Sequence, residues 1–183
     1  MIYDGSSNRA VRRDEPETAR EASPVNRVDS SLHLLDYLNA DAVAVGLKQR
    51  TKLEALELLV GLVQHRIPQS GPGRLLEAIL HRENVVSTGI GNHVAIPHAD
   101  LPEVEAPLLA LGVFPEGIDF DSVDEEPVTL VFLLLGTPRT PGLHMKILAR
   151  IARLSKDPDF EALETAGSGE EALLILNRIE ARQ

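Results

Sequence analysis

A histidine follows a glycine-containing loop and a short apolar run in the stretch from Ser87 to Asp100, which reads STGIGNHVAIPHAD. Gly89 and Gly91 let backbone N–H groups approach a bound anion closely, because no Cβ intervenes. Pro97 fixes its own φ and biases the residue before it toward an extended backbone, so we expect the strand to stop there. His98 is then held by the scaffold at the end of the strand while it still faces solvent. Backbone donors and an imidazole on one short stretch predict phosphoryl chemistry.

The longer sequence EAILHRENVVSTGIGNHVAIPHA closely resembles the active-site region of the fructose/mannitol-type (type 2) enzyme IIA domain of the bacterial phosphoenolpyruvate-dependent sugar phosphotransferase system, a family that includes nitrogen-regulatory members. About twenty consecutive positions match in order, and the resemblance runs from about Ser31 to the C-terminus. It implies that His98 carries the phosphoryl group. The chemistry agrees, because a neutral imidazole is a good nitrogen nucleophile near pH 7. Which ring nitrogen attacks is left open by the sequence.

Two further residues match positions of the family. Arg82 lies in HREN, like the family's Arg-Glu pair, and a guanidinium is well shaped to grip phosphate oxygens. His144 opens HMKILARIARL and is similar to the family's second histidine at a helix start, where a phosphate would meet free N–H groups and the positive end of the dipole. The ordinary alternatives are a helix C-terminal cation and an exposed histidine with no task. The candidate phosphate-binding loop consists of Ser87, Thr88, Gly89 and Gly91.

The other histidines carry weaker signals. His93 departs from the family, which usually has Gly at that place. If this position requires a positive φ, histidine is less favourable there than glycine. His93 could also add a third imidazole near the site. We expect the three histidines without a motif, His33, His65 and His81, to be surface residues on helices.

Two competing functions belong to other classes. A metal site would gather His93, His98, Asp100 and His144 around a divalent ion, but their spacing matches no recognised ligand pattern, so no metal is predicted. A pure interaction module would have lost phosphoryl transfer. The joint presence of His98, His144 and Arg82 argues against that interpretation.

The resemblance also implies the partners. His98 would accept a phosphoryl group from a phosphohistidine carrier protein (HPr-like) and pass it to a cysteine of an enzyme IIB domain, without a cofactor. Because the sequence carries no IIB or IIC segment, we expect either a separate acceptor polypeptide or a nitrogen-type regulatory protein. In the regulatory case phosphorylation would alter binding to a target protein. The residues leave these two alternatives open.

Composition narrows the class of protein. The 183 residues suffice for one substantial domain, and 43% hydrophobic with only 3% aromatic residues predicts an aliphatic core. The absence of cysteine excludes disulfides and thiolate metal sites. A net charge of −10, with no block of Lys and Arg, argues against nucleic-acid binding. No run approaches the roughly 18 to 20 apolar residues of a membrane span, and the N-terminus lacks a signal-peptide core, so a cytoplasmic protein not embedded in a membrane is expected.

Periodicity divides the chain into a tail and one domain. Residues 1–30 show no period that would bury a face and are predicted to be a disordered tail, which leaves 31–183 as the enzyme IIA-like phosphoryl-relay domain. The fold class expected for it, and also implied by the resemblance, is α+β in three layers (α/β/α), a mixed β-sheet with helices on both faces. Arg150 is assigned to the polar side of the helix that begins near residue 143. The expected elements are a short helix at 32–38, a strand at 41–46, helices at 51–66 and 75–83, strands at 107–114 and 128–135, and helices at 143–154, 159–165 and 169–181, with capping boxes at Thr51–Glu54 and Ser168–Glu171.

Overall fold

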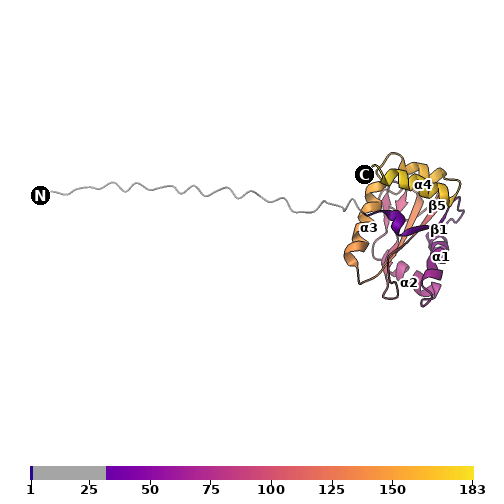
Figure 1. The fold of residues 1–183 in the computed structure, drawn as a ribbon, viewed down its shortest axis with the longest axis horizontal. Coiled ribbons are helices and arrows are strands. Elements are labelled where there is room, and N and C mark those ends of the chain that lie inside the picture. Colours follow the sequence, from indigo (N-terminus) through magenta and orange to yellow (C-terminus); the bar gives the residue numbers. More distant parts are fainter. Residues whose placement is uncertain (2–31) are drawn as a thin grey trace.

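The computed structural model describes Met1 and residues 32–183, so the predicted tail lies outside the described residues apart from Met1 (Figure 1). The described part alternates helices and strands without strict βαβ order. No helix in it is long and apolar enough to cross a membrane. In chain order the elements are η1 (Leu34–Asp36), β1 (Leu38–Ala44), α1 (Lys52–Val63), η2 (Gln64–Arg66), α2 (Pro72–Glu83), β2 (Gly89–Gly91), β3 (Val94–Ala95), β4 (His98–Asp100), β5 (Leu108–Ile118), β6 (Val128–Gly136), α3 (Pro141–Leu154), η3 (Phe160–Thr165) and α4 (Gly169–Glu180).

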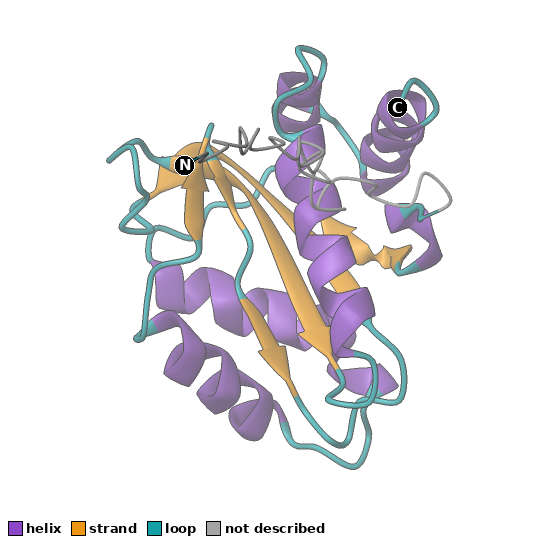
Figure 2. Cartoon of the chain, turned by 90° about the vertical axis from the view of Figure 1, so that its left-hand side faces the viewer, coloured by secondary structure: helices purple, strands orange, loops and turns teal. Residues whose placement is uncertain are grey.

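The strands form one mixed sheet in the order β1-β5-β6-β3-β2, and β4 also pairs with β6. β1 is parallel to β5, and β3 and β4 are parallel to β6, whereas the β5–β6 and β2–β3 pairs are antiparallel. Figure 2 shows the sheet between two groups of helices, with α1 and α2 along one side and α3 and α4 on the other. The predicted three-layer α+β architecture is confirmed.

The core is centred on β5 and β6 and is mostly aliphatic, as predicted, although all four phenylalanines of the chain are also buried in it. Every residue of β6 is buried, as are six consecutive residues of β5. Strands covered by helices on both faces need apolar side chains at every position, which is why both read as continuous apolar runs in the sequence. The core therefore fixes β6 as a rigid support for the strands beside it.

The N-terminal edge of the domain differs from the predicted short helix. Only one 3₁₀ turn forms at residues 34–36, and β1 begins at Leu38, three residues before the predicted strand. The Leu34 N–H donates to both carboxylate oxygens of Glu180, each at 3.0 Å, across 146 residues of sequence. This bond satisfies a free N–H at the start of the turn, and the helix predicted at 32–38 is shortened to η1 because the chain enters β1 at Leu38.

The same carboxylate corrects the prediction for Arg150. That side chain is 1% exposed, and its Nε donates to Glu180 Oε1 at 3.2 Å. A helical pattern assigns every arginine to the polar side, because it does not show an ionic partner contributed by another helix. Arg150 thus joins α3 to the end of α4 inside the core.

A break in the strand beside β6 places His98. β3 ends at Ala95, and Pro97 supplies no N–H to continue the ladder. The Pro97 carbonyl nevertheless accepts from Leu134 N at 2.9 Å, so the chain stays beside β6 and resumes as β4. The strand stops before Pro97 as predicted, but His98 opens a second short strand instead of following the last one.

Candidate active site

His98 lies in a cavity of about 430 Å³ between α2, β4 and α3. On β4, His98 and Asp100 are two residues apart and therefore project from the same face of the sheet. The sequence-predicted residues Arg82 and His144 line the same cavity, from the end of α2 and the first turn of α3. Three residues separated by up to 62 positions in the sequence thus meet at one place. The remaining lining residues are Ala78, His81, Ala99, Met145 and Leu148.

The two ring nitrogens of His98 have different partners. Nδ1 lies 2.8 Å from the carbonyl oxygen of Ile96, which can only accept, so Nδ1 carries the hydrogen. Nε2 accepts a hydrogen bond from Arg82 Nε at 3.1 Å, which requires a lone pair on Nε2. The structure therefore assigns the tautomer that the sequence left open. The unprotonated nitrogen is the one that meets Arg82.

Electrostatics keep His98 neutral. Burial lowers the pKa of His98 below its ordinary value, and the positive charge of Arg82 and the neighbouring His144 lower it further, against the opposite effect of the bond to Ile96 and of the Asp100 charge. An imidazole with a pKa below about 6.5 is unprotonated near pH 7. The side chain is therefore in its nucleophilic form at neutral pH.

Arg82 is held at two points. Its Nε donates to His98, and its Nη1 donates to the carbonyl oxygen of Val86 at 3.0 Å. Because Arg82 is in the last turn of α2, the helix fixes its backbone and the two bonds fix its planar head. The guanidinium is thereby positioned beside the nitrogen on which a phosphoryl group would sit.

His144 is buried, with 5% of its surface exposed, and so differs from the alternative of an idle surface histidine. Its ring packs edge-on against that of His98, with 5.3 Å between centroids, and its Nδ1 lies 2.8 Å from Asp100 Oδ1. Gly136, which pairs with Asp100 in the sheet, makes room for this arrangement, since a Cβ there would overlap both His144 Nδ1 and Asp100 Oδ1. The absence of a side chain at residue 136 is thus a condition for the His144–Asp100 pair.

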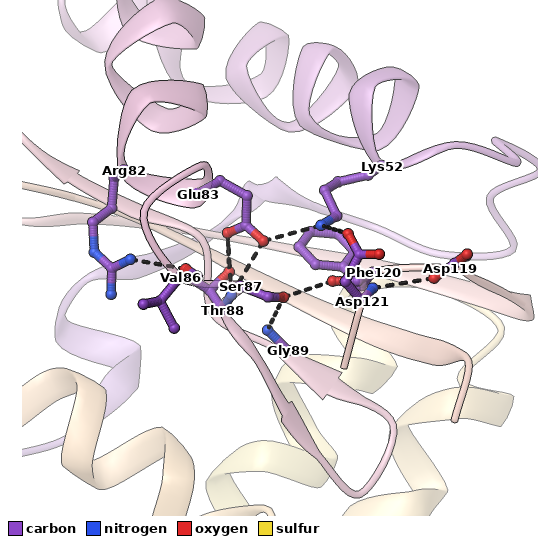
Figure 3. A network of polar contacts seen from close by, with 10 residues as sticks. All are labelled: Lys52, Arg82, Glu83, Val86, Ser87, Thr88, Gly89, Asp119, Phe120 and Asp121. Carbon is purple, nitrogen blue, oxygen red and sulfur yellow. Dashed lines mark hydrogen bonds and ion pairs between the residues drawn. The ribbon is translucent and has the colours of Figure 1, made fainter. Parts of the chain in front are cut away.

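The candidate phosphate-binding loop takes part in a network of hydrogen bonds with Glu83 and Phe120 (Figure 3). The N–H and hydroxyl of Thr88 both donate to the carboxylate of Glu83, and Thr88 is 4% exposed. Ser87 Oγ donates to the Phe120 carbonyl at 2.6 Å and accepts from Gly89 N at 3.2 Å. These four donors already have protein partners in the structure, and phosphate binding by this loop stays a prediction.

His93 is separated from this site by the length of the β2–β3 hairpin. Its φ is +60°, so the position does require the left-handed region, as does the preceding Asn92 at +53°. The ring lines a different cavity, together with Asp124 and Glu164, and its Nδ1 lies 2.8 Å from the Pro127 carbonyl. His93 therefore does not add a third imidazole beside His98, and it cannot join His98, Asp100 and His144 in a metal site. Among the described residues, no group of three or more His, Asp or Glu side chains is arranged to hold a metal ion.

Several cavity residues were missed in the sequence. His33, His65 and His81 are exposed as expected, but His33 precedes η1 in an extended conformation instead of lying on a helix, and His81 also lines the cavity beside Arg82. Asp100 was considered only as a metal ligand, although its period-2 spacing from His98 was a usable signal. Met145, which is 64% exposed, adds an apolar edge that follows from its position next to His144.

Comparison with known proteins identifies the family. The profile of the phosphoenolpyruvate-dependent sugar phosphotransferase system EIIA type 2 family matches residues 36–179. A nitrogen regulatory protein of Bradyrhizobium diazoefficiens is 37% identical over 126 residues, covering 69% of this chain and 82% of that protein. A nitrogen regulatory protein of Escherichia coli is 36% identical over 156 residues, covering 83% and 94%.

Solved structures agree on the fold. The nitrogen regulatory protein IIA-Ntr of Neisseria meningitidis superposes with a TM-score of 0.73 at 28% identity, covering 77% of this chain and 97% of that one. The mannitol enzyme IIA of Escherichia coli superposes with a TM-score of 0.65 at 22% identity, covering 75% and 97%. With the sequence profile spanning most of the described domain, this chain belongs to the type 2 enzyme IIA family of the phosphoenolpyruvate-dependent sugar phosphotransferase system.

Proposed function

We propose that this phosphotransferase-system IIA component carries its phosphoryl group on Nε2 of His98. The hydrogen bond from His98 Nδ1 to the Ile96 carbonyl carries the proposal, because it places the only ring proton away from the cavity. Nε2 then has a free lone pair beside a fixed guanidinium. A neutral, oriented imidazole of this kind is what nucleophilic catalysis by histidine requires.

The proposed donor is a phosphohistidine carrier protein whose phosphorylated ring is protonated. The Nε2 lone pair of His98 forms a bond to phosphorus while the N–P bond of the donor breaks, and its electron pair stays on the donor nitrogen. One positive charge passes from the donor ring to the His98 ring, which keeps its Nδ1 proton. The carbonyl of Ile96 stabilises that charge, since a hydrogen bond to a charged donor is stronger than one to a neutral donor.

Arg82 and His144 stabilise the phosphoryl group in this scheme. Transfer between two nitrogens depends on positioning and on neutralising charge at the equatorial oxygens. As the phosphoryl group arrives at Nε2, the Arg82 N–H groups bind its oxygens. With Nδ1 facing Asp100 Oδ1, the His144 ring donates from Nε2 to a phosphoryl oxygen in the form in which both ring nitrogens carry a hydrogen.

Carrier-dependent labelling tests the proposal. The protein is incubated with a purified phosphohistidine carrier, its upstream kinase and labelled phosphoenolpyruvate. We expect one acid-labile, base-stable phosphoryl group, as for phosphohistidine, and no label on a folded His98→Ala variant. Undiminished labelling of His98→Ala would refute the assignment.

A regulatory output is the second candidate, and the relatives favour it. The nitrogen regulatory proteins of Bradyrhizobium diazoefficiens and Escherichia coli share 37% and 36% identity with this chain over 82% and 94% of their own length. A fructose-specific EIIA component of Haloferax volcanii shares 35% over 67% of its length, and a fructose-specific EIIABC component of Bacillus subtilis shares 27% over 23%. In this role phosphorylation of His98 would change the affinity for a target protein, because it replaces a neutral ring with a dianionic group.

The two outputs differ in where the phosphoryl group goes. A solved complex joins the mannitol enzyme IIA of Escherichia coli with phosphorylated enzyme IIB, so a IIB cysteine is the acceptor to test for transport. The labelled protein is mixed with purified IIB domains, and the label remaining on His98 is followed over time. Transfer at a rate comparable to loading supports transport, whereas retention of the label supports the regulatory output.

A further inference from the structure

We propose that Glu83 is a positioning residue, which fixes the orientation and the tautomer of His98 through the loop between α2 and β2. The inference rests on the proposed role of His98 as the phosphoryl acceptor. Glu83 itself does not line the cavity and touches no reacting atom. It acts through Thr88 and the backbone of Ile96.

Glu83 is a buried carboxylate with a complete set of partners (Figure 3). It is 6% exposed, and it accepts from Thr88 N at 3.1 Å and from Thr88 Oγ1 at 2.6 Å. Lys52 Nζ, from the first turn of α1, donates to the same carboxylate at 3.2 Å and to Asp121 at 2.7 Å. A buried charge that is paired and hydrogen-bonded on both oxygens holds its partners in one geometry.

The position of Thr88 is passed on to His98 by two backbone bonds. The Thr88 carbonyl accepts from Ile96 N at 3.0 Å, and the Ile96 carbonyl accepts the Nδ1 proton of His98 at 2.8 Å. The carbonyl that sets the tautomer of His98 is therefore anchored through Thr88 to Glu83. Each link is within ordinary hydrogen-bond distance.

The same helix end holds the other side of the imidazole. Arg82, the residue before Glu83, donates to His98 Nε2. The path from Glu83 through Thr88, Ile96 and His98 thus returns to α2 at Arg82. Adjacent residues of one rigid helix fix both ring nitrogens of His98, and this closed arrangement distinguishes Glu83 from a carboxylate that only neutralises Lys52.

The test compares Glu83→Gln with Glu180→Gln. Glu180 is the matched control, because it is also a buried carboxylate, 3% exposed, which accepts from a backbone N–H and pairs with a cation, but at the other end of the core. Three quantities are measured on the full chain: the melting temperature, the His98 tautomer by ¹⁵N–¹H correlation NMR, and the initial rate of carrier-dependent phosphorylation. Thr88→Val removes only the hydroxyl bond to Glu83, and Thr88→Ser retains it.

We expect both glutamine variants to melt at lower temperature, but only Glu83→Gln to lose the single Nδ1–H tautomer. Its phosphorylation should slow by roughly tenfold to a hundredfold, the order expected when a reacting group is misplaced by about 1 Å. Thr88→Val should show the same change of tautomer to a smaller degree, and Thr88→Ser should resemble the parent.

An unchanged tautomer and rate in a destabilised Glu83→Gln protein would overturn the inference, and so would equal effects from Glu180→Gln. If Glu83→Gln does not fold, the tautomer and the phosphorylation rate of Thr88→Val are compared with those of Thr88→Ser, and equal values in these two variants would overturn the inference. The two proposals can fail separately. If Glu83→Gln changes the His98 tautomer but the phosphoryl label is found on another residue, the positioning effect stands and the proposed function of His98 is refuted.

Discussion

His98 and His93 stand five residues apart at the two ends of one short segment, and their surroundings act on them in opposite directions. Burial lowers the pKa of His98, and nearby positive charge adds to that effect. At His93 the bond to the Pro127 carbonyl raises the pKa most, burial opposes it, and the charges of Glu164, Glu126 and Asp124 each raise it further. One imidazole is kept neutral and the other is biased toward the charged form.

The difference shows that the residue type alone does not make a nucleophile. Both histidines donate or can donate from Nδ1 to a backbone carbonyl. Only His98 has a cation at its second nitrogen and a buried partner ring beside it. His93 is instead surrounded by carboxylates, which favour protonation and repel a phosphoryl dianion. The environment thus favours His98 over the neighbouring His93 as a nucleophile.

After the loss of His98 itself, the largest effect on the rate of phosphorylation is expected from His144→Ala, which removes the partner ring that distinguishes His98 from His93. The variant should still be phosphorylated on His98, but about one to two decades more slowly, because a hydrogen bond to a charged group is worth about 1.5 to 3 kcal/mol. Initial rates and peptide mapping with the same carrier at fixed pH measure this. A label on His144, or a folded His144→Ala protein as inert as His98→Ala, would contradict this division of roles between the two histidines. His93→Gly is the matched control and should keep the parent rate.

Arg82→Met should alter the dependence of the rate on pH. In the parent, the neutral fraction of His98 falls only as the pH drops below about 6.5, because the pKa lies under the ordinary value. Removing the guanidinium removes one cause of that lowering, so the acid-side loss of rate should begin at a higher pH. The plateau above it should also fall by about tenfold through the lost hydrogen bonds.

The phosphorylation rate of Arg82→Met is divided by that of the parent at each pH from 5 to 8, so that the titration of the shared carrier cancels. This ratio should decline toward acid pH. A ratio that stays constant across this range would show that Arg82 does not influence the protonation of His98.

The smallest effect is expected on stability, from His93→Gly. Glycine relieves the cost of a φ of +60°, about 1 kcal/mol, which favours the variant at high pH. The raised pKa of His93 means that its charged form stabilises the parent fully below the unfolded pKa of about 6.5, and that this contribution is lost as the pH rises through the folded pKa. The variant should therefore compare better with the parent at pH 8.5 than at pH 5.5. Melting temperatures at both values measure the difference, and the opposite order would exclude His93 as the source.

Much of this site could be predicted because its residues are encoded in local patterns. The strand run of β6, the Thr51–Glu54 capping box and the proline before His98 all act within a few residues, and each appears in the structure. The assembly of Arg82, His98 and His144 in one cavity followed from the family resemblance, since no local pattern states it. Their individual chemical roles are still predictions, which the labelling and rate measurements on the variants test.

The features that were missed depend on contacts between distant segments. Arg150 was predicted on the polar side of its helix because its partner Glu180 is 30 residues away. The helix predicted at 32–38 is shortened to η1, since β1 already begins at Leu38. The donors of Thr88 bind the Glu83 carboxylate in the structure, and the assignment of this loop to phosphate binding stays a prediction. At Arg150 and at Thr88 a buried carboxylate, which sequence patterns treat as solvent-exposed, determines the local contacts.

Gly136 makes the geometry of the site depend on the register between β4 and β6. Asp100 pairs with Gly136, and Ala99 with Leu135. If β4 and β6 paired one residue out of step, Asp100 would face Leu135 or Thr137, and a side chain would occupy the space that His144 and Asp100 need. Such a near-native species would retain most of its secondary structure and yet lack the site. With His98 as the phosphoryl acceptor proposed above, carrier-dependent phosphorylation would therefore report on the register of β4 against β6 to within a single residue, which spectroscopic measures of secondary structure do not resolve.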